Sequence, residues 1–273
     1  MSTGLLRGKR GIIFGALDEQ SIAWKVAERC VEEGARLTLS NTPAAIRFGK
    51  ITQLGEKLQA EIIPADATKI DDLEQVFTKS VELLDGPIDF LLHSIGMSVN
   101  MRKNRSYTEL NYEWMLKTLD ISALSFHKMM ATGMRLDAFN EGASILALSY
   151  IAAQRVFPDY SEMAEAKALL ESIARSFGYH LGKWKRIRVN TISQSPTKTT
   201  AGSGVKGFDL FFDYADKMAP LGNAPAEACA DLCVVMFSDL TRYITMQNIY
   251  HDGGFSSMGL NPDVLALFKS HDA

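Results

Sequence analysis

The hydrophobic positions of the chain alternate between short unbroken runs and longer stretches of helical period. Short apolar runs bounded by glycine, proline or polar residues predict strands at 11–14, 36–40, 61–65, 88–93, 142–149, 186–193 and 247–251. Apolar residues that recur every three or four positions predict helices at 21–33, 44–58, 71–84 and 108–134, and a further helix that begins at Tyr160. Strands that alternate with helices and are apolar almost throughout are typical of a parallel sheet buried on both faces. We therefore predict an α/β fold with a doubly wound seven-stranded parallel sheet, formed by residues 1–273 as one domain.

In an open parallel sheet, ligands bind beyond the carboxyl ends of the strands. The residues that follow those ends here are mostly small or polar: Gly15, Thr42, Asp66, Ala67, Ser94, Ile95, Gly96, Ser149, Tyr150 and residues 193–200. Each one alone is an ordinary start of a loop. Because they converge on one edge of the sheet, we expect a site that holds a ribose and a nicotinamide.

The first predicted strand leads through Gly15 into a helix that starts at Ser21 and Ile22. Such a turn offers free backbone N–H groups and the positive end of a helix to an anion, as a dinucleotide pyrophosphate requires. The Gly-x-Gly-x-x-Gly spacing is absent, so the motif by itself is weak. The alternative is a plain strand-to-helix turn in which Ser21 caps the helix.

Residues 142–174 contain the most distinctive pair of side chains. An apolar strand is followed by a loop closed by Pro158 and by a helical segment with Tyr160 and Lys167. Seven residues at 100° each return to within about 20° of the starting direction, so both side chains would share one helix face, about 10 Å apart along the axis. A phenol near an ammonium suits a catalytic hydroxyl whose proton affinity the cation lowers. Chance sharing of a helix face is the alternative.

Composition narrows the class of protein. The 273 residues are 47% hydrophobic, and 29 basic against 32 acidic residues leave a net charge of -3, which gives no support for binding nucleic acid through a basic field. Three cysteines are too few for a disulfide framework, so we expect a reducing, cytoplasmic compartment. Cys229 and Cys233 lack a second Cys/His pair that would complete a metal site, so we expect them to be thiols of the core and predict no metal site. The basic residues near the N-terminus are followed by only a short apolar run, so we predict no secretory signal. Nowhere do about 18 apolar residues follow one another, so we predict no membrane span.

The order of these motifs resembles the NADH-dependent enoyl-acyl-carrier-protein reductases of bacterial fatty-acid synthesis, a divergent branch of the short-chain dehydrogenases/reductases. The matching segments are Gly15 with residues 21–23, then 93–96, 148–150, Tyr160-x6-Lys167, 188–190 and 251–254. The likeness extends to about Met258, and Tyr-x6-Lys is its most discriminating feature, because ordinary members of the superfamily use Tyr-x3-Lys. It implies a Rossmann-like fold, a homotetramer, and NADH as the reductant of an enoyl thioester carried by acyl carrier protein in the last step of each elongation cycle.

Conjugate reduction explains the displaced tyrosine. Hydride goes to C3 of the thioester, so the oxygen that gains charge is farther from the nicotinamide than in carbonyl reduction, and a shift of three residues moves the phenol about 4.5 Å along a helix. We expect Tyr160 to hydrogen-bond the enolate oxygen and Lys167 to hold the nicotinamide ribose. We expect Tyr150 to contact substrate or assist protonation, with plain packing as the alternative for it.

The resemblance also implies which residues bind the ligands. The cofactor set is Gly15, Ser21, Ile22, Thr42, Asp66, Ala67, Ser94, Ile95, Gly96, Lys167, Thr197, Lys198, Thr199, Thr200 and Ala201. The substrate set is Met97, Ser98, Tyr150, Tyr160 and Met163. The second predicted strand ends without the acidic residue that would exclude a 2′-phosphate; Thr42 stands there, with Arg47 five residues on. NADH is favoured by the resemblance, and NADPH stays open. Gln194-Ser195-Pro196 replaces the Ala-Gly-Pro often found after the sixth strand.

Residues 197–221 combine a loop of small residues with aromatic side chains at Phe208, Phe211, Phe212 and Tyr214. We predict a substrate lid whose aromatics, with Met163, line a pocket for the acyl chain. Core or subunit packing of these aromatics is the alternative. A small basic cluster at Arg102, Lys103 and Arg105 suits an acidic carrier protein or is simply a solvated loop.

Two other functions remain as alternatives. A carbonyl-reducing dehydrogenase of the 3-oxoacyl type would need a correctly placed Tyr-x3-Lys, which is missing. A non-catalytic nucleotide-sensing or scaffold protein could use the same fold. The joint presence of the tyrosine, the lysine and the cofactor turn argues against the second alternative.

Overall fold

The computed structural model describes residues 2–200, 202 and 207–269. Its centre is one sheet of seven strands in the order β3-β2-β1-β4-β5-β6-β7, and every neighbouring pair is parallel. The strands are β1 (Arg10–Phe14), β2 (Arg36–Asn41), β3 (Ile62–Pro64), β4 (Ile88–His93), β5 (Phe139–Ser149), β6 (Arg188–Gln194) and β7 (Asn248–His251). The predicted seven-stranded, doubly wound parallel sheet is confirmed.

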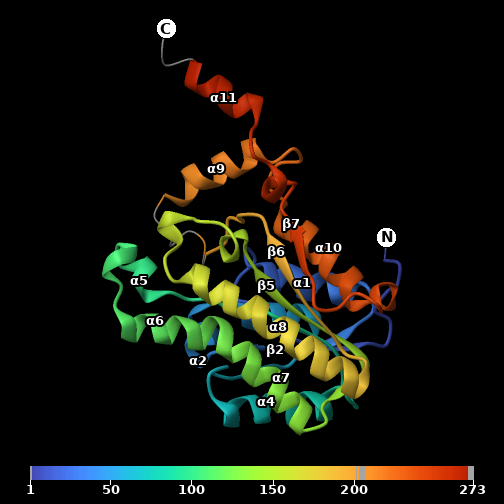
Figure 1. The fold of residues 1–273 in the computed structure, drawn as a ribbon. Helices are drawn as coiled ribbons and strands as arrows, with labels where there is room; N and C mark the ends of the chain where they lie inside the picture. The colour runs from blue at the N-terminus through green and yellow to red at the C-terminus, as the bar shows by residue number, and fades with distance from the viewer. Residues whose placement is uncertain (1, 201, 203–206, 270–273) are drawn as a thin grey trace.

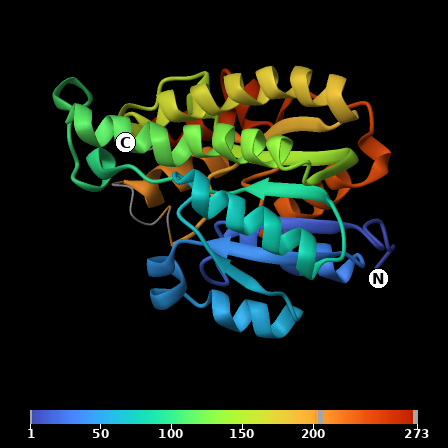
Figure 2. The ribbon, with the colours of Figure 1, turned by 90° about the horizontal axis from the view of Figure 1, so that it is seen from below.

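Helices cover both faces of the sheet (Figure 1). One face packs against α4 (Ile70–Leu83), α7 (Ser125–Arg135) and α8 (Met163–Lys185), and the other against α1 (Ile22–Glu32), α3 (Ile51–Leu58) and α10 (Ala226–Phe237). Successive side chains of β1 point to opposite faces, so Ile12 and Phe14 join the first core and Ile13 joins the second. Burial on both faces explains why the strands are apolar almost without interruption. Figure 2 shows the same layers from below.

The strand order changes direction between β1 and β4, which creates a crevice at their carboxyl ends. Gly15 follows β1 with φ +96°, and a Cβ atom there would lie 2.0 Å from the carbonyl oxygen of Ser94, just after β4. The left-handed conformation and the close approach both require glycine. The first turn is therefore packed directly against the entrance of the crevice.

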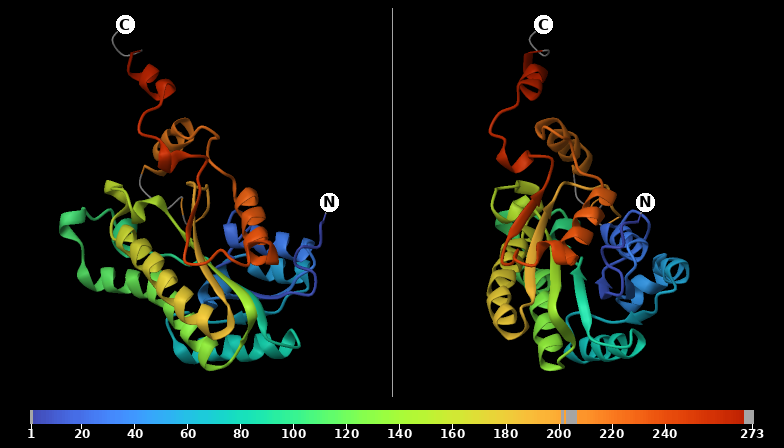
Figure 3. Two further views of the ribbon diagram at one scale, coloured as in Figure 1. Left: turned by 45° about the vertical axis from the view of Figure 1, so that its right-hand side comes forward. Right: turned by 90° about the vertical axis from the view of Figure 1, so that its right-hand side faces the viewer.

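The remaining helices surround the carboxyl ends of the strands. Three of them are α2 (Pro43–Phe48), α5 (Val99–Arg102) and α6 (Tyr112–Leu119). The chain after β6 and β7 continues into α9 (Phe208–Met218) and α11 (Pro262–Lys269), which contact each other beyond the strand ends (Figure 3). Within the described ranges, no helix combines the length and apolar character that crossing a membrane would require.

The helix predicted at 44–58 is in fact two helices, α2 and α3, separated at Gly49. A Cβ atom on Gly49 would lie 2.6 Å from Leu17 Cδ1 and 2.8 Å from its carbonyl oxygen, and the Lys50 N–H donates to that oxygen at 2.8 Å. The helix is broken because this segment packs against the turn after β1. Local periodicity does not contain that tertiary contact.

The helix predicted at 108–134 begins later and is irregular. A short 3-10 turn precedes α6, and a π-helical turn at Asp120–Leu124 joins α6 to α7. Within that turn, Ser122 Oγ accepts a hydrogen bond from the Met97 N–H at 3.1 Å. The irregular turn thus holds the backbone just after β4, and π-helical turns are frequent at functional sites.

Candidate active site

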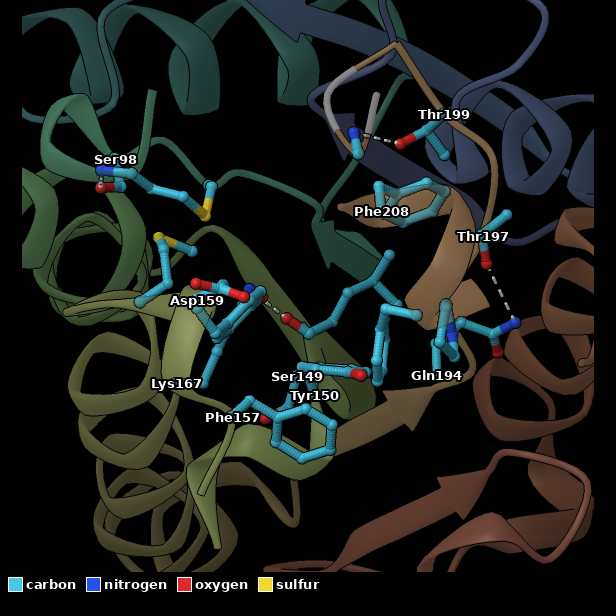
Figure 4. A pocket seen from close by; sticks show the side chains of 18 of the residues that line it. Ser98, Ser149, Tyr150, Phe157, Asp159, Lys167, Gln194, Thr197, Thr199 and Phe208 are labelled. Atoms are coloured by element: carbon cyan, nitrogen blue, oxygen red, sulfur yellow. Dashed lines mark hydrogen bonds between the residues drawn. The ribbon is translucent and has the colours of Figure 1, made fainter. Parts of the chain in front are cut away.

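A cavity of about 340 Å³ lies at the carboxyl ends of the central strands (Figure 4). Its wall comes from the segments after β4 and β5, the start of α8, the end of β6 and the helix α9. The predicted site residues that line it are Ile22, Ser94, Ile95, Gly96, Met97, Ser98, Tyr150, Tyr160, Met163, Lys167, Thr197 and Thr199. The structure therefore brings together most of the residues that lie far apart in the sequence.

Three other predicted cofactor residues lie outside the cavity wall, after β2 and β3. Thr42 Oγ1 accepts from the Ala45 N–H at 3.2 Å and so caps α2. The Asp66 carboxylate accepts from the Thr68 N–H at 3.0 Å, and Ala67 beside it is buried. This part of the strand edge is separate from the cavity, as the adenosine end of a long dinucleotide would require.

The turn after β1 is stabilised by its own side chains. Ser21 Oγ donates to the Asp18 carbonyl oxygen at 2.7 Å and accepts from the Leu17 N–H at 3.2 Å, and makes no side-chain cap to α1. Thr200 donates to the Asp18 carboxylate, which links the segment after β6 to this turn. Lys198 lies 4.5 Å from the centre of the Phe212 ring, over a neighbouring hollow. Ala201 lies outside the described residues.

Tyr160 is not part of the helix that carries Lys167, so that prediction is wrong. It ends a 3-10 turn at Pro158–Tyr160, whereas α8 begins at Met163. Ser161 lies between them with φ 52° and ψ −148°, a conformation that breaks any continuous helix. The argument from seven residues on one helix face therefore fails, as does the shift of about 4.5 Å along the axis. The two side chains still line the same cavity.

Lys167 is buried, with 8% of its surface exposed, on the first turns of α8. Its Nζ donates to the Leu148 carbonyl oxygen at 2.7 Å, and a Cβ atom on Gly96 would lie 3.8 Å from that Nζ. Burial lowers the pKa of Lys167 to about 8, while Glu171 one turn later partly opposes the shift. The ammonium thus reaches the cavity beside a glycine that leaves room for a ligand.

Tyr150 and Tyr160 form a contact pair, with ring centres 5.0 Å apart. Burial raises the pKa of both phenols, so the expectation that Lys167 lowers the proton affinity of Tyr160 is wrong. Both hydroxyls stay protonated at neutral pH and can act as neutral hydrogen-bond donors. The Tyr150 hydroxyl is buried and lacks a hydrogen-bond partner within the described residues. A buried donor without a partner is costly, so this hydroxyl is suited to donate to a ligand oxygen.

The opposite side of the cavity is aromatic. Phe208 and Phe211 of α9 line it, and the Phe211 ring centre lies 5.2 Å from that of Phe157 and 6.2 Å from that of Tyr150. Phe212 packs on Phe208, and Tyr214 packs on Phe255 away from the cavity wall. This side offers an apolar surface to a ligand.

Several residues of the site escaped the sequence-based prediction. Phe157 and Asp159 line the cavity and were not predicted, whereas Gln194, which also lines it, lies within the predicted stretch 193–200. Gln194 Nε2 donates to the Ala224 carbonyl oxygen at 2.8 Å, and its Oε1 lies 2.6 Å from His251 Nδ1. The signal that could have found Phe157 and Asp159 is their position around Pro158, in the loop that leads to Tyr160.

Two buried carboxylates, Glu162 and Glu171, also escaped prediction. Glu171 accepts from Ser149 Oγ at 2.6 Å and from Gln154 Nε2 at 3.1 Å. The sequence carries no signal for them, because both lie in a stretch with other charged residues, which is also typical of a solvated face. Across the described part of the chain, no group of three or more His, Cys, Asp or Glu side chains is arranged to hold a metal ion.

The basic cluster lies at the rim of the cavity. Arg102 contributes to the wall, Lys103 is exposed, and the Arg105 guanidinium lies 5.9 Å from the Trp114 ring centre. The cluster therefore places positive charge beside the cavity.

Comparison with known proteins gives consistent results. The family model described as Enoyl-(Acyl carrier protein) reductase matches residues 15–256. A curated relative, enoyl-(acyl-carrier-protein) reductase (NADH) 1 of Rhizobium meliloti strain 1021, is 33% identical over 272 residues, covering 97% of this chain and 98% of the relative. The crystal structure of a FabI–NADH complex from Alistipes finegoldii is 59% identical with a TM-score of 0.94, covering 94% of this chain and 91% of that one. The enoyl-(acyl-carrier-protein) reductase (NADH) of Aquifex aeolicus VF5 is 29% identical with a TM-score of 0.87, covering 94% and 100%.

Proposed function

This chain belongs to the enoyl-(acyl carrier protein) reductase family, and from that premise we propose that it transfers a hydride from NADH to C3 of a trans-2-enoyl thioester. The reaction is the last step of each fatty-acid elongation cycle. The observation that carries the proposal is the convergence of the Tyr150 and Tyr160 phenols and the Lys167 ammonium on one cavity, at the point where the strand order reverses.

The residues around the crevice fit a dinucleotide. Gly15 lets the first turn approach Ser94 closely, and Gly96 leaves the space beside Lys167 free of a side chain. We assign the pyrophosphate to the turn before α1, the nicotinamide ribose to Lys167, and the adenosine to the ends of β2 and β3. When bound, NADH supplies the hydride. Thr42 and Arg47 leave the end of β2 without an acid, so competition by NADPH is the measurement that tests the preference for NADH.

The protein's own contribution to the reaction is electrostatic. As C3 is reduced, negative charge develops on the thioester oxygen, and we assign the Tyr160 hydroxyl to donate a hydrogen bond to that oxygen. Because burial raises its pKa, the phenol stays protonated and can donate at neutral pH. Tyr150, in ring contact with Tyr160, is assigned to the substrate or to the proton that completes the reaction.

The segment 197–221 serves as a lid in this proposal. Support comes from Phe208 and Phe211, which line the cavity, and from the bond between Thr200 and Asp18, which joins this segment to the cofactor turn. The apolar wall would hold the acyl chain, and the cationic rim at Arg102 would meet an acidic carrier protein. Limited proteolysis with and without NADH tests the lid, since equal cleavage in both samples contradicts it.

We further propose a cytoplasmic homotetramer in which each chain acts as one catalytic domain. Two separate exposed apolar faces support the assembly: one on α6 with Tyr112 and Leu116, and one beside the edge strand β7 with Leu240 and Tyr243. Three buried free cysteines fit a reducing compartment. Light scattering coupled to size-exclusion chromatography measures the assembly directly.

One assay tests the reaction itself. NADH is supplied with a crotonoyl thioester and, separately, with an acetoacetyl thioester, and the loss of reduced nicotinamide is followed by absorbance. We expect oxidation with the crotonoyl thioester alone. Oxidation with the acetoacetyl thioester alone would identify a carbonyl reductase, and no oxidation with either would identify a non-catalytic protein. Parallel assays with carrier-protein and coenzyme A thioesters determine which carrier the enzyme prefers.

A further inference from the structure

Glu162 follows Tyr160 by two residues and is completely buried, with an exposed fraction of 0%. Side chains from several segments donate hydrogen bonds to its carboxylate. Oε2 accepts from Ser161 Oγ at 2.6 Å, and Oε1 accepts from Ser98 Oγ at 2.7 Å, Thr118 Oγ1 at 2.8 Å and Asn100 Nδ2 at 3.2 Å. The carboxylate is thus fully committed to neighbouring donors.

This buried charge depends on hydrogen bonds alone. Among the described residues, no lysine, arginine or histidine forms an ion pair with Glu162. Burial by itself would raise the pKa of Glu162, but the bonds from Ser161, Ser98 and Thr118 outweigh it and lower the pKa. A buried carboxylate without a cation is expensive unless its acceptors are satisfied, so its four donors are held in place together with it.

The bond to Ser161 acts on a strained position of the backbone. Ser161 has φ 52° and ψ −148°, a region that residues other than glycine rarely enter and that costs about 1–3 kcal/mol. This bend takes the chain from the turn that carries Tyr160 into α8. Without it, Tyr160 would continue the helix axis instead of lying 5.0 Å from the Tyr150 ring.

The bonds to Oε1 hold the facing part of the cavity. Ser98 lines the cavity, and its Oγ also accepts from the Met101 N–H at 2.9 Å, which starts α5. Asn100 accepts from the Asn111 N–H at 2.9 Å, next to the start of α6. One carboxylate therefore connects the Tyr160 turn to the cavity wall at Ser98 and α5, and to α6 behind it.

We propose that Glu162 is a positioning residue: its carboxylate holds the Ser161 bend and thereby fixes the Tyr160 ring beside Tyr150, in the cavity that Ser98 also lines. The chemical part of this inference rests on the proposed function, because it takes Tyr160 as the donor to the enolate oxygen. The structural part does not, because it concerns only where the Tyr160 ring lies.

The test compares Glu162→Ala with Glu162→Gln, Tyr160→Phe and the double variant Glu162→Ala/Tyr160→Phe. We expect Glu162→Ala to lower kcat for crotonoyl thioester about 10- to 100-fold with the NADH Kd within twofold, and to have no further effect when Tyr160 is already phenylalanine. Glu162→Gln keeps an oxygen for the three donors at Oε1, and the Ser161 hydroxyl can rotate, so we expect kcat within about threefold of the parent.

The control is Glu33→Ala, a second completely buried carboxylate that accepts from Thr3, Leu5 and Arg29 and does not line the cavity. We expect it to lower the unfolding temperature without changing kcat. Independent, multiplying effects of Glu162→Ala and Tyr160→Phe would overturn the positioning role, as would equal losses in Glu162→Gln and Glu162→Ala.

A crystal structure of Glu162→Ala separates this inference from the proposed reaction. We expect the Tyr160 ring to leave its contact with Tyr150 and the Ser161 backbone to relax. A ring that stays in place overturns the inference, whatever reaction the protein catalyses. If Glu162→Ala does not fold, the variant Ser161→Ala is used instead, because it removes only the hydrogen bond at the bend. A Tyr160 ring that stays in place in Ser161→Ala would also overturn the inference. Failure of the parent protein to oxidise NADH with crotonoyl thioester overturns the proposed function alone.

Discussion

The two sides of the cavity are built in different ways. On the sheet side, polar groups are buried and joined by short hydrogen bonds, such as Lys167 Nζ to the Leu148 carbonyl oxygen at 2.7 Å and Ser149 Oγ to Glu171 at 2.6 Å. On the α9 side, the surface that faces the cavity is made of rings, such as Phe211 against Phe157, and the neighbouring Leu210 is 79% exposed. The two surfaces that face the cavity thus differ, polar on one side and aromatic on the other, although α9 itself is also held by hydrogen bonds such as that from Asn223 Nδ2 to the Phe212 carbonyl oxygen at 2.9 Å.

This difference suits two tasks. Hydrogen bonds to buried groups hold donors to within a fraction of an ångström, as stabilisation of a developing charge requires. Apolar contacts are not directional, so an aromatic surface can accept acyl chains of different length. The experiments below are expected to affect catalysis strongly on the sheet side and chain selection weakly on the α9 side.

The largest effect is expected from Tyr160→Phe. Removal of one donor to an oxyanion typically lowers kcat about 10²- to 10³-fold, and the NADH Kd should stay within twofold because the ribose contact is assigned to Lys167. Steady-state kinetics with crotonoyl thioester and a fluorescence titration with NADH measure the two quantities. Tyr179→Phe is the matched control, since Tyr179 is 57% exposed on α8 and does not line the cavity. Near-normal turnover of Tyr160→Phe would show that the hydroxyl has another role.

Gly15→Ala tests the crevice itself. The added Cβ atom would meet the Ser94 carbonyl oxygen at 2.0 Å, with φ at +96°, so we expect a loss of about 3 kcal/mol in the free energy of unfolding and at least tenfold weaker NADH binding. Gly142→Ala is the control, because it has φ +73° with nothing within 4 Å, and should cost only about 1 kcal/mol. Equal losses in the two variants would mean that the contact with Ser94 is unimportant.

Alkaline pH should weaken NADH binding, while the deprotonation of Lys167 by itself adds to the stability of the fold. The pKa of Lys167 is about 8 in the folded protein and 10.5 in its ordinary state, so the ammonium assigned to the ribose is lost as pH rises through 8. Between pH 8 and 10.5 the unfolded chain binds more protons at this position, so its contribution to the free energy of unfolding rises with pH. NADH titrations and denaturant unfolding at pH values from 7 to 9.5 measure how the NADH Kd and the free energy of unfolding change with pH. Lys167→Met should flatten both pH dependences, and unchanged pH dependences in that variant would contradict the assignment.

The smallest effect is expected on the α9 side. Phe211→Ala should raise KM for a long-chain enoyl thioester about 3- to 10-fold and leave kcat/KM for crotonoyl thioester within twofold, because a lost ring contact is worth about 1 kcal/mol. Leu210→Ala, at the exposed neighbouring position, is the control. A loss of kcat for the short substrate as large as that of Tyr160→Phe would remove the distinction between the two sides.

The fold was predictable because its signals are local. Strands buried on both faces are apolar throughout, and the helices between them keep their period. The exceptions come from contacts between distant segments. The break at Gly49 is made by Leu17, and the π-helical turn is held by the bond from the Met97 N–H to Ser122. No pattern within 44–58 or 108–134 contains those partners.

The site was predictable in part for the same reason. The ends of the strands converge by topology, so Ser94, Gly96 and Tyr150 were found from their places in the chain, whereas Lys167 was found from its spacing to Tyr160 and from the family resemblance. The position of Tyr160 was not, because its turn depends on the bend at Ser161. Periodicity treats an acidic residue such as Glu162 as part of a solvated face, whereas here its donors come from segments about 44 and 64 residues away.

The π-helical turn at Asp120–Leu124 has a geometric consequence. Such a turn holds one residue more than an α-helical turn, so the helical phase after it is rotated by about 100° relative to the phase before it. Thr118, before the turn, can therefore face Glu162, while Phe126 and Met129, after the turn, face the sheet. The side chains before and after the turn are thus directed independently. Deletion of a single residue from this turn would restore a regular helix and force the two directions into competition.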